Sequence, residues 1–300
     1  MVPAICCIGH ITVDHVITPG SRLTMPGGTA YYFSHAIANM PVRYHLVTAQ
    51  AATEMPVVDE LRARNIPVVV LPSDCSVIFE NKYGNDLGQR SQRVLQKAAP
   101  FSAEQLMGVD AQIFHLGPLL ADDFSLDAIR TIAEKGKISL DVQGFLRRVE
   151  ATHVMAVDWK EKIAVLPVVH FLKASEEEME VLTGCTNVFE GAGVLSAWGA
   201  REVIITGGSK GSVIYNGVDY TVIPAYLPQQ ETDATGCGDT YMAGYLFQRS
   251  SGASIQQAGE FASAMAALKI EKAGPFRGTV DDVNAVVNAG QRIRSRFIGV

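Results

Sequence analysis

Short apolar runs, rich in β-branched residues, alternate with helical patterns along most of this 300-residue chain. Several runs are apolar at every position, which is typical of strands covered by helices on both faces. The alternation predicts a doubly wound α/β fold with a mostly parallel central sheet, and we expect one domain over residues 1–300. The expected strands are residues 4–9, 44–49, 68–71, 113–117, 138–142, 170–173, 203–206 and 212–215.

The ends of the helices between these strands are marked in the sequence. Ser125 is expected to cap the start of one helix, and Gly136 to close it in a left-handed conformation. A serine followed three residues later by Glu or Gln is a capping-box pattern, which predicts further helix starts. These starts are Ser102, Ser175 and Ser254.

One stretch interrupts the alternation. Residues 76–100 place β-prone residues around a polar turn, and residues 14–26 are similar in character. We expect these two segments to form a small antiparallel sheet beside the main body. Such a sheet can act as a lid, but two ordinary surface hairpins explain the same pattern, and the sequence leaves both interpretations open.

Composition excludes several classes of function. The 25 Lys and Arg residues oppose 31 Asp and Glu residues, for a formal net charge of −6. The chain therefore lacks the positive field that nucleic acid or an anionic membrane surface requires. Its five cysteines follow no disulfide or metal-ligand spacing, no apolar run is long enough to span a membrane, and no basic stretch precedes the first apolar run. We expect a cytoplasmic protein with reduced thiols.

The most informative segment is TDATGCGDTYMAGY, residues 232–245. Gly236 and Gly238, on either side of Cys237, form a turn that leads directly into Asp239 and a helical pattern. Backbone N–H groups in such a turn converge at the positive end of the helix and favour an anion. A carboxylate beside a bound phosphoryl group can accept a proton from an attacking hydroxyl. A plain helix cap after a flexible loop is the alternative for Asp239.

The longer pattern Asp233-x-Thr235-Gly236-x-Gly238-Asp239-x-x-x-Ala243-Gly244 resembles the C-terminal signature of the ribokinase-like carbohydrate kinases, the phosphofructokinase-B family. The resemblance covers almost the whole chain. It implies a ribokinase-like fold with a small β lid, and transfer of the γ-phosphate of ATP to an alcohol with the help of Mg²⁺. By the same resemblance Asp239 is the catalytic base, and the amides of Gly236, Cys237 and Gly238 form an anion hole.

An aspartate follows the first strand, and a di-glycine opens a helical segment. The family uses the matching residues, here Asp14, Gly27 and Gly28, to hold the hydroxyls of the acceptor. A carboxylate accepts such hydrogen bonds, and glycine lets a polyol approach the backbone. Many members carry Asn four residues after the second glycine, where this chain has Tyr32, so the acceptor pocket is expected to differ. A turn acid and a helix start are the alternative explanation.

Two further positions match cation sites of the family. Glu178, in FLKASEEEMEVLTG, matches a glutamate that organises Mg²⁺ through water, while Ser175 replaces the usual Asn. A capping box alone also explains this pair. Asp233 and Thr235 match a loop that binds a monovalent cation in some members, so the resemblance implies activation by K⁺.

The segment VIITGGSKGSVIY resembles the family's nucleotide-contacting turn, in which Thr206, Gly208 and Gly211 would line the ATP site; a simple hairpin is the alternative. The resemblance also implies contacts from Gly236 and Gly238 to ATP. The Ala-rich helix near residues 262–269 would form a wall for adenine or belong to the core. Gln143 and Arg147 follow a strand at the edge where open α/β sheets bind ligands. We expect them to hold an acceptor hydroxyl and a phosphate.

The segments LDVQGFLRRV and KASE and the aromatic residue after the di-glycine resemble plant-type inositol kinases. We therefore expect a kinase that phosphorylates a small polyol or sugar-like alcohol, with a cyclitol such as myo-inositol ahead of a sugar or nucleoside. A non-catalytic nucleotide- or sugar-binding regulatory module on the same fold is the alternative. No nucleic-acid or membrane partner is expected, and exposed lid edges favour a homodimer.

Overall fold

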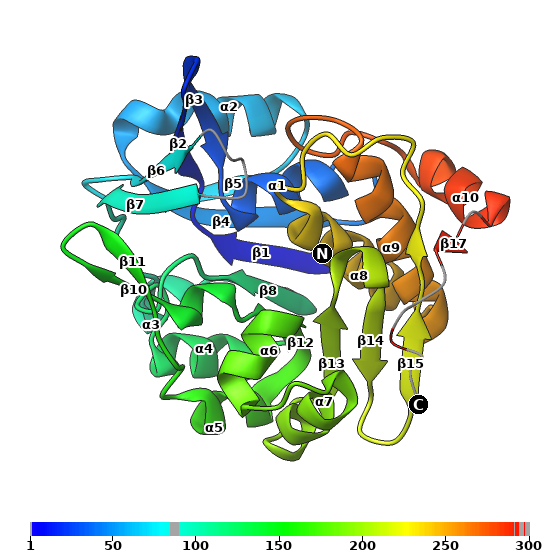
Figure 1. The fold of residues 1–300 in the computed structure, drawn as a ribbon. Helices are drawn as coiled ribbons and strands as arrows, with labels where there is room; N and C mark the ends of the chain where they lie inside the picture. Colours follow the sequence, from blue (N-terminus) through cyan, green and yellow to red (C-terminus); the bar gives the residue numbers. More distant parts are fainter. Residues whose placement is uncertain (1, 85–89, 291, 294–296, 298–300) are drawn as a thin grey trace.

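The centre of the molecule is a nine-stranded sheet, seen in the computed structural model (Figure 1). The structure describes residues 2–84, 90–290, 292–293 and 297. The strands of this sheet are β1 (Ile5–Gly9), β4 (Tyr44–Gln50), β5 (Val68–Pro72), β8 (Ile113–Gly117), β9 (Lys137–Asp141), β12 (Val169–Ser175), β13 (Glu202–Thr206), β14 (Ser212–Tyr215) and β15 (Tyr220–Ile223).

The strand order is β15-β14-β13-β12-β9-β8-β1-β4-β5. The pairs from β13 to β5 are parallel, and β14 and β15 add an antiparallel edge. All eight predicted strands are present, each within two residues of its predicted ends. Strand β15 was not predicted. The parallel majority confirms the doubly wound α/β prediction.

Helices cover both faces of this sheet. The first core contains side chains of α1 (Thr29–Ile37), α2 (Met55–Ala63), α8 (Cys237–Ser250), α9 (Ile255–Ile270) and α10 (Val280–Ala289). The second contains side chains of α3 (Ala103–Leu106), α4 (Leu126–Ala133), α5 (Lys162–Val165), α6 (Glu176–Thr183) and α7 (Val188–Ala197). Strand β1 contributes to both, because successive side chains point to opposite faces: Cys6 packs in one core and Cys7 in the other.

The helix starts follow local sequence. Each predicted capping box is present: the serine hydroxyl accepts a hydrogen bond from the backbone N–H three residues on, and the Glu or Gln side chain accepts one from the serine N–H. These serines are Ser102, Ser175 and Ser254. Ser125 likewise caps α4.

The end of α4 differs from the prediction. The helix ends at Ala133, three residues before Gly136. Gly136 is not among the residues with positive φ in the described part of the chain, so the expected left-handed cap is wrong. A side chain at this position would overlap the carbonyl oxygen of Ala111. Glycine therefore serves a close approach of two backbone segments here.

A second, six-stranded sheet stands beside the first (Figure 1). Its strands are β2 (Thr12–Thr18), β3 (Ser21–Gly27), β6 (Val77–Tyr83), β7 (Arg90–Gln96), β10 (Arg147–Glu150) and β11 (His153–Ala156), in the order β10-β11-β7-β6-β2-β3. Residues 14–26 and 76–100 therefore contribute strands to one sheet, although residues 85–89 lie outside the described residues. The expectation of a purely antiparallel sheet is wrong, because β2 and β6 pair in parallel and an unpredicted hairpin, β10–β11, joins them.

The second sheet is connected to the carboxyl ends of strands of the first sheet, because β2 follows β1 and β10 follows β9 after short connections. Those connections include the 3₁₀ turn η2 (Gln143–Leu146); the other 3₁₀ turns are η1 (Ala52–Glu54), η3 (Leu166–Val168) and η4 (Gly208–Lys210).

A separate pair of strands is formed by β16 (Ala225–Tyr226) and β17 (Arg292–Ile293). Dimerisation through the exposed edges of the second sheet stays a prediction. Among the helices that the structure describes, none is long and apolar enough to cross a membrane.

Candidate active site

A buried ion pair lies at the carboxyl ends of β9 and β12. The Nζ atom of Lys173 is 3.0 Å from Oδ2 of Asp141 and 3.7 Å from Oε2 of Glu178, and the three side chains are at most 14% exposed. Burial alone would lower the pKa of Lys173, but the two carboxylates outweigh it and raise that pKa. Lys173 is therefore a fixed positive charge at neutral pH.

Asp239 lies in the first turn of α8, within the electrostatic reach of this pair. Burial and the Asp141 carboxylate raise the pKa of Asp239 to about 6. Lys173, Arg147 and a hydrogen bond from the Thr29 hydroxyl act in the opposite direction. A carboxyl group that titrates near neutral pH is suited to general-base catalysis.

The loop before Asp239 depends on glycine. Gly236 precedes α8 with a φ of 77°, and a side chain there would overlap the ring of Tyr32. The N–H of Cys237 donates to the carbonyl of Ala234 at 3.1 Å, so this amide of the predicted anion hole is engaged within the loop. The N–H groups of Gly238 and Asp239 follow in the first turn of α8, where a helix offers them no acceptor of its own.

The Lys173 ammonium lies beside these first-turn amides. A Cβ atom built on Gly238 would be 3.3 Å from Lys173 Nζ. A lysine ammonium and the N-terminal turn of α8 therefore lie close together. Together they can bind a phosphoryl group that is negatively charged.

The predicted acceptor residues come from β2, β3 and α1. The Thr12 hydroxyl donates to Oδ1 of Asp14 at 2.7 Å, and a side chain on Gly27 would press on the Asp14 carboxylate. Gly28, with a φ of 84°, precedes α1. Tyr32 is 3% exposed, and after burial the carboxylates of Asp233, Asp14 and Asp239 raise its pKa. Tyr32 therefore lies among the carboxylates of both predicted sites.

Gln143 and Arg147 follow β9 on the side of Asp141. The backbone N–H of Gln143 donates to Oδ1 of Asp141 at 3.0 Å. Arg147 begins β10 in the second sheet and lies near enough to Asp239 to lower its pKa. The adjacent Arg148 instead pairs with Glu150 in an exposed position. Of these two arginines, the structure therefore brings Arg147 to the site.

A cavity of about 210 Å³ adjoins the first turn of α8. Four of the five residues predicted to bind ATP line it, and Gly236 does not; the four are Thr206, Gly208, Gly211 and Gly238. Most of the remaining lining is apolar or aromatic and comes partly from α9, as the expected adenine wall requires. This lining includes Ala225, Tyr226, Pro228, Ala266, Ala267 and Ile270.

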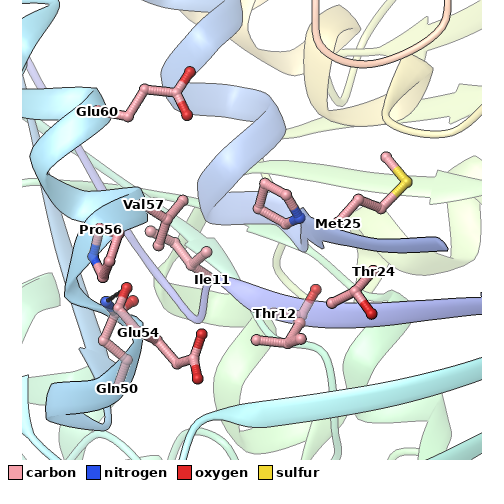
Figure 2. Close-up of a pocket in the computed structure, with 11 residues that line it drawn as sticks. Ile11, Thr12, Thr24, Met25, Gln50, Glu54, Pro56, Val57 and Glu60 are labelled. Atoms are coloured by element: carbon pink, nitrogen blue, oxygen red, sulfur yellow. Dashed lines mark hydrogen bonds between the residues drawn. The ribbon is translucent and has the colours of Figure 1, made fainter.

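A second cavity, of about 300 Å³, opens between the β2–β3 hairpin and the start of α2 (Figure 2). Thr12 and Met25 line it from the hairpin, and Gln50, Glu54 and Glu60 from the opposite side. None of the predicted acceptor residues is in its lining. Thr12 nevertheless lines this cavity and donates its hydroxyl hydrogen bond to Asp14, so the cavity adjoins the predicted acceptor residues.

The predicted cation ligands have partners within the chain. Oε2 of Glu178 accepts a hydrogen bond from the Ser175 N–H at 2.7 Å, besides its pairing with Lys173. The described part of the chain contains no group of three or more His, Cys, Asp or Glu residues that could hold a metal ion. Proteins often bind Mg²⁺ through one or two carboxylates together with substrate phosphates. Glu178 therefore fits a supporting contact to a Mg²⁺ ion that arrives with the donor.

The monovalent-cation loop has partners as well. Thr235 donates its N–H to Oδ1 of Asp233 at 2.9 Å. The Nζ atom of Lys269 is 3.3 Å from Oδ2 of the same carboxylate. A lysine ammonium thus stands next to the position predicted for K⁺.

Sequence reasoning assigned no role to Lys173, Thr29 or Lys269. The only local signal for Lys173 was a charged residue at the end of an otherwise apolar strand, since buried lysines need paired carboxylates. The partners of Lys173 come from β9 and α6, so the strand sequence alone could not identify them.

A model of the family described as pfkB family carbohydrate kinase matches residues 69–280. Cytidine kinase of Thermococcus kodakarensis is 28% identical over 285 residues, which cover 91% of this chain and 98% of that protein. A pyrophosphate-dependent kinase in the ribokinase family, solved as a sulfate complex, is 27% identical with a TM-score of 0.85, over 94% of this chain and 99% of that one. The same kind of kinase complexed with a pyrophosphate analogue and myo-inositol is 27% identical with a TM-score of 0.83, over the same shares.

These similarities extend over nearly the full length of the compared proteins and agree with the two-sheet architecture. They show a ribokinase-like kinase, a phosphotransferase whose acceptor is a hydroxyl group, and set aside the non-catalytic alternative. The chain belongs to the pfkB family of carbohydrate kinases.

Proposed function

We propose that this enzyme transfers the γ-phosphoryl group of ATP to a hydroxyl of a small ring-shaped polyol, with Asp239 as the general base. The observation that carries the proposal is the position of Asp239, a carboxylate with a pKa of about 6 in the helix turn that also offers the Gly238 amide. The acceptor oxygen forms the new bond to phosphorus while its proton moves to Asp239 and ADP leaves.

The first turn of α8 and Lys173 would offset the charge of the phosphoryl group during transfer. The lysine is held by two carboxylates and lies next to Gly238, so it needs no rearrangement to act. Mg²⁺ bound with ATP would supply further neutralisation of the phosphates, with Glu178 as the protein group that could support it.

The cavity beside α8 supports a nucleotide donor. Its apolar and aromatic lining suits a planar base, and its polar end adjoins Gly238. Pyrophosphate is the second candidate donor, because two similar structures are pyrophosphate-dependent kinases. Pyrophosphate has no base, so its use would leave the apolar part of this cavity without a role.

Two acceptor classes have support. Structural similarity to a kinase complexed with myo-inositol favours a cyclitol, and sequence similarity to a cytidine kinase favours the ribose of a nucleoside. Both acceptor classes present neighbouring ring hydroxyls. A carboxylate such as that of Asp14 can accept hydrogen bonds from two such hydroxyls. We place the cyclitol first.

The second sheet would close over the acceptor as a lid. It carries Asp14 on β2, which acts on Tyr32, and Arg147 on β10, which acts on Asp239, so strands from two parts of this sheet contribute charged groups to the site. Closure would exclude water, which otherwise competes with the acceptor hydroxyl for the phosphoryl group.

The test is a turnover assay of the purified chain with Mg²⁺ and either ATP or pyrophosphate, against myo-inositol, ribose and cytidine. We expect release of ADP with ATP that rises when myo-inositol is added. Turnover with pyrophosphate and not with ATP would favour the second donor, and stimulation by cytidine alone would favour the nucleoside. Failure of every acceptor to stimulate release from either donor would contradict the proposal. Asp239→Asn is the control for contaminating kinases.

A further inference from the structure

Lys269 lies in the last turn of α9, and its ammonium group points into a cluster of oxygen atoms. Nζ lies 2.8 Å from the backbone oxygen of Asp233, 3.3 Å from Oδ2 of Asp233 and 3.4 Å from the backbone oxygen of Lys272. The Lys269 side chain is 1% exposed. A lysine so completely buried requires this kind of compensation.

The cluster joins two distant parts of the chain. The N–H groups of Thr232 and Asp233 both donate to the backbone oxygen of Ile270, at 2.8 and 3.1 Å. The loop that begins at residue 232 is thereby attached to the C-terminal end of α9, where the helix dipole also favours a positive charge. Three residues after Asp233 the same loop reaches Gly236, and α8 begins immediately afterwards.

The oxygens that a monovalent ion would need at Asp233 are already used. Oδ1 of Asp233 accepts the Thr235 N–H at 2.9 Å, and Oδ2 accepts the Gly274 N–H at 3.3 Å in addition to its contact with Lys269. The ammonium is itself a compact monovalent cation that binds oxygen ligands. A K⁺ ion does not fit beside it without displacing these contacts.

We propose that the Lys269 ammonium is a built-in replacement for a monovalent cation, and that this enzyme does not require K⁺. The role is one of positioning, because Lys269 holds the loop that leads to the Gly238 and Asp239 amides. The effect on catalysis rests on the proposed function of those amides. The effect on stability does not, because it depends only on the loop and α9.

The first test uses the unaltered protein. Activity and thermal unfolding are measured in about 100 mM KCl and in tetramethylammonium chloride of equal ionic strength, since tetramethylammonium is too large for the cluster. We expect kcat/KM to change less than about twofold and the melting temperature to stay constant. A loss of more than about tenfold in kcat/KM without K⁺, or a melting temperature that rises with K⁺, would overturn the proposal.

The second test removes the ammonium. Lys269→Ala vacates the cluster, and Lys272→Ala is the matched control because Lys272 is an exposed lysine in the same segment that contributes only its backbone oxygen. We expect Lys269→Ala to melt about 5 °C or more below the control in tetramethylammonium, and to recover in part in K⁺ or NH₄⁺. Equal melting of the two variants in both salts would overturn the proposal.

A third variant separates the charge from the space. Lys269→Met keeps most of the side-chain volume but brings no charge, so we expect it to be destabilised like Lys269→Ala and not to recover in K⁺. Recovery of the Met variant in K⁺ would show that the ion binds elsewhere and would contradict the proposal. The response of the melting temperatures to K⁺ can be measured without substrate, so it does not depend on the assignment of the acceptor or the donor.

Discussion

The ammonium nitrogen of Lys173 lies 3.0 Å from the carboxylate of Asp141, and these two buried groups act on Asp239 with opposite charges. Asp141 raises the pKa of Asp239 and Lys173 lowers it, while burial adds to the effect of Asp141. The protonation of Asp239 is therefore set by a balance that either neighbour can shift.

Replacing the general base should abolish most turnover without unfolding the protein. A positioned base contributes about 10²–10⁴-fold to the rate, so Asp239→Asn should lower kcat by that factor in a steady-state assay. The raised pKa means that the folded state disfavours ionised Asp239, so the variant should melt no lower than the unaltered protein at pH 8. Near-normal turnover in the pure variant would rule out the assigned role.

Activity should fall in mild acid. Asp239 must be deprotonated to accept a proton, and its pKa is raised to about 6, compared with about 4 for an exposed aspartate. The profile of log kcat/KM against pH should therefore bend near pH 6 and fall with unit slope below it. A bend near pH 4 instead would show that Asp239 is not perturbed as the structure indicates.

Opposite shifts of this acidic limb should follow from two substitutions. Asp141→Asn removes a negative neighbour and should move the bend to lower pH, whereas Lys173→Met removes a positive neighbour and should move it to higher pH. Each variant breaks the buried ion pair between Lys173 and Asp141, so both should melt at lower temperature. Both variants are expected to be less stable, so a general loss of structure would move the bend in the same direction for both. Such a result would contradict the electrostatic assignment.

The acceptor side should be separable from the donor side. Asp14→Ala removes a carboxylate that accepts a hydrogen bond from Thr12 and lies near Tyr32, so we expect KM for the acceptor to rise about tenfold or more while KM for ATP stays within about twofold. Thr12→Val is the matched control, since it removes only the hydrogen bond to Asp14 and should have the smaller effect. Equal losses for both substrates would contradict the assignment of Asp14.

Features that depend on a few consecutive residues could be predicted. The capping boxes at Ser102, Ser175 and Ser254 were found because their hydrogen bonds span three residues. The parallel strands were found because continuous apolar runs allow burial on both faces. The glycine turn before Asp239 was also evident, although only the structure showed that Gly236 faces the ring of Tyr32.

Other features could not be predicted because they depend on partners far away in the chain. The β10–β11 hairpin is short, half of its residues are polar, and it joins the second sheet through its pairing with β7. The Cys237 amide was expected in the anion hole, yet the fold of the loop directs it to Ala234. The expectation of a K⁺ loop did not anticipate Lys269, which lies 36 residues after Asp233.

The amino-acid sequence by itself determined the alternation of parallel strands and helices, the capped helix starts and the glycine turn that points to phosphate, because local hydrogen bonding and periodic burial depend on residues that are close together in the chain. Tertiary structure alone decided the charges around that turn. Lys173, Asp141 and Asp239 come from β12, β9 and α8, and Lys269 reaches Asp233 from α9. Electrostatic energies depend on distance and burial in three dimensions, and neither quantity can be obtained from the spacing of residues along the chain.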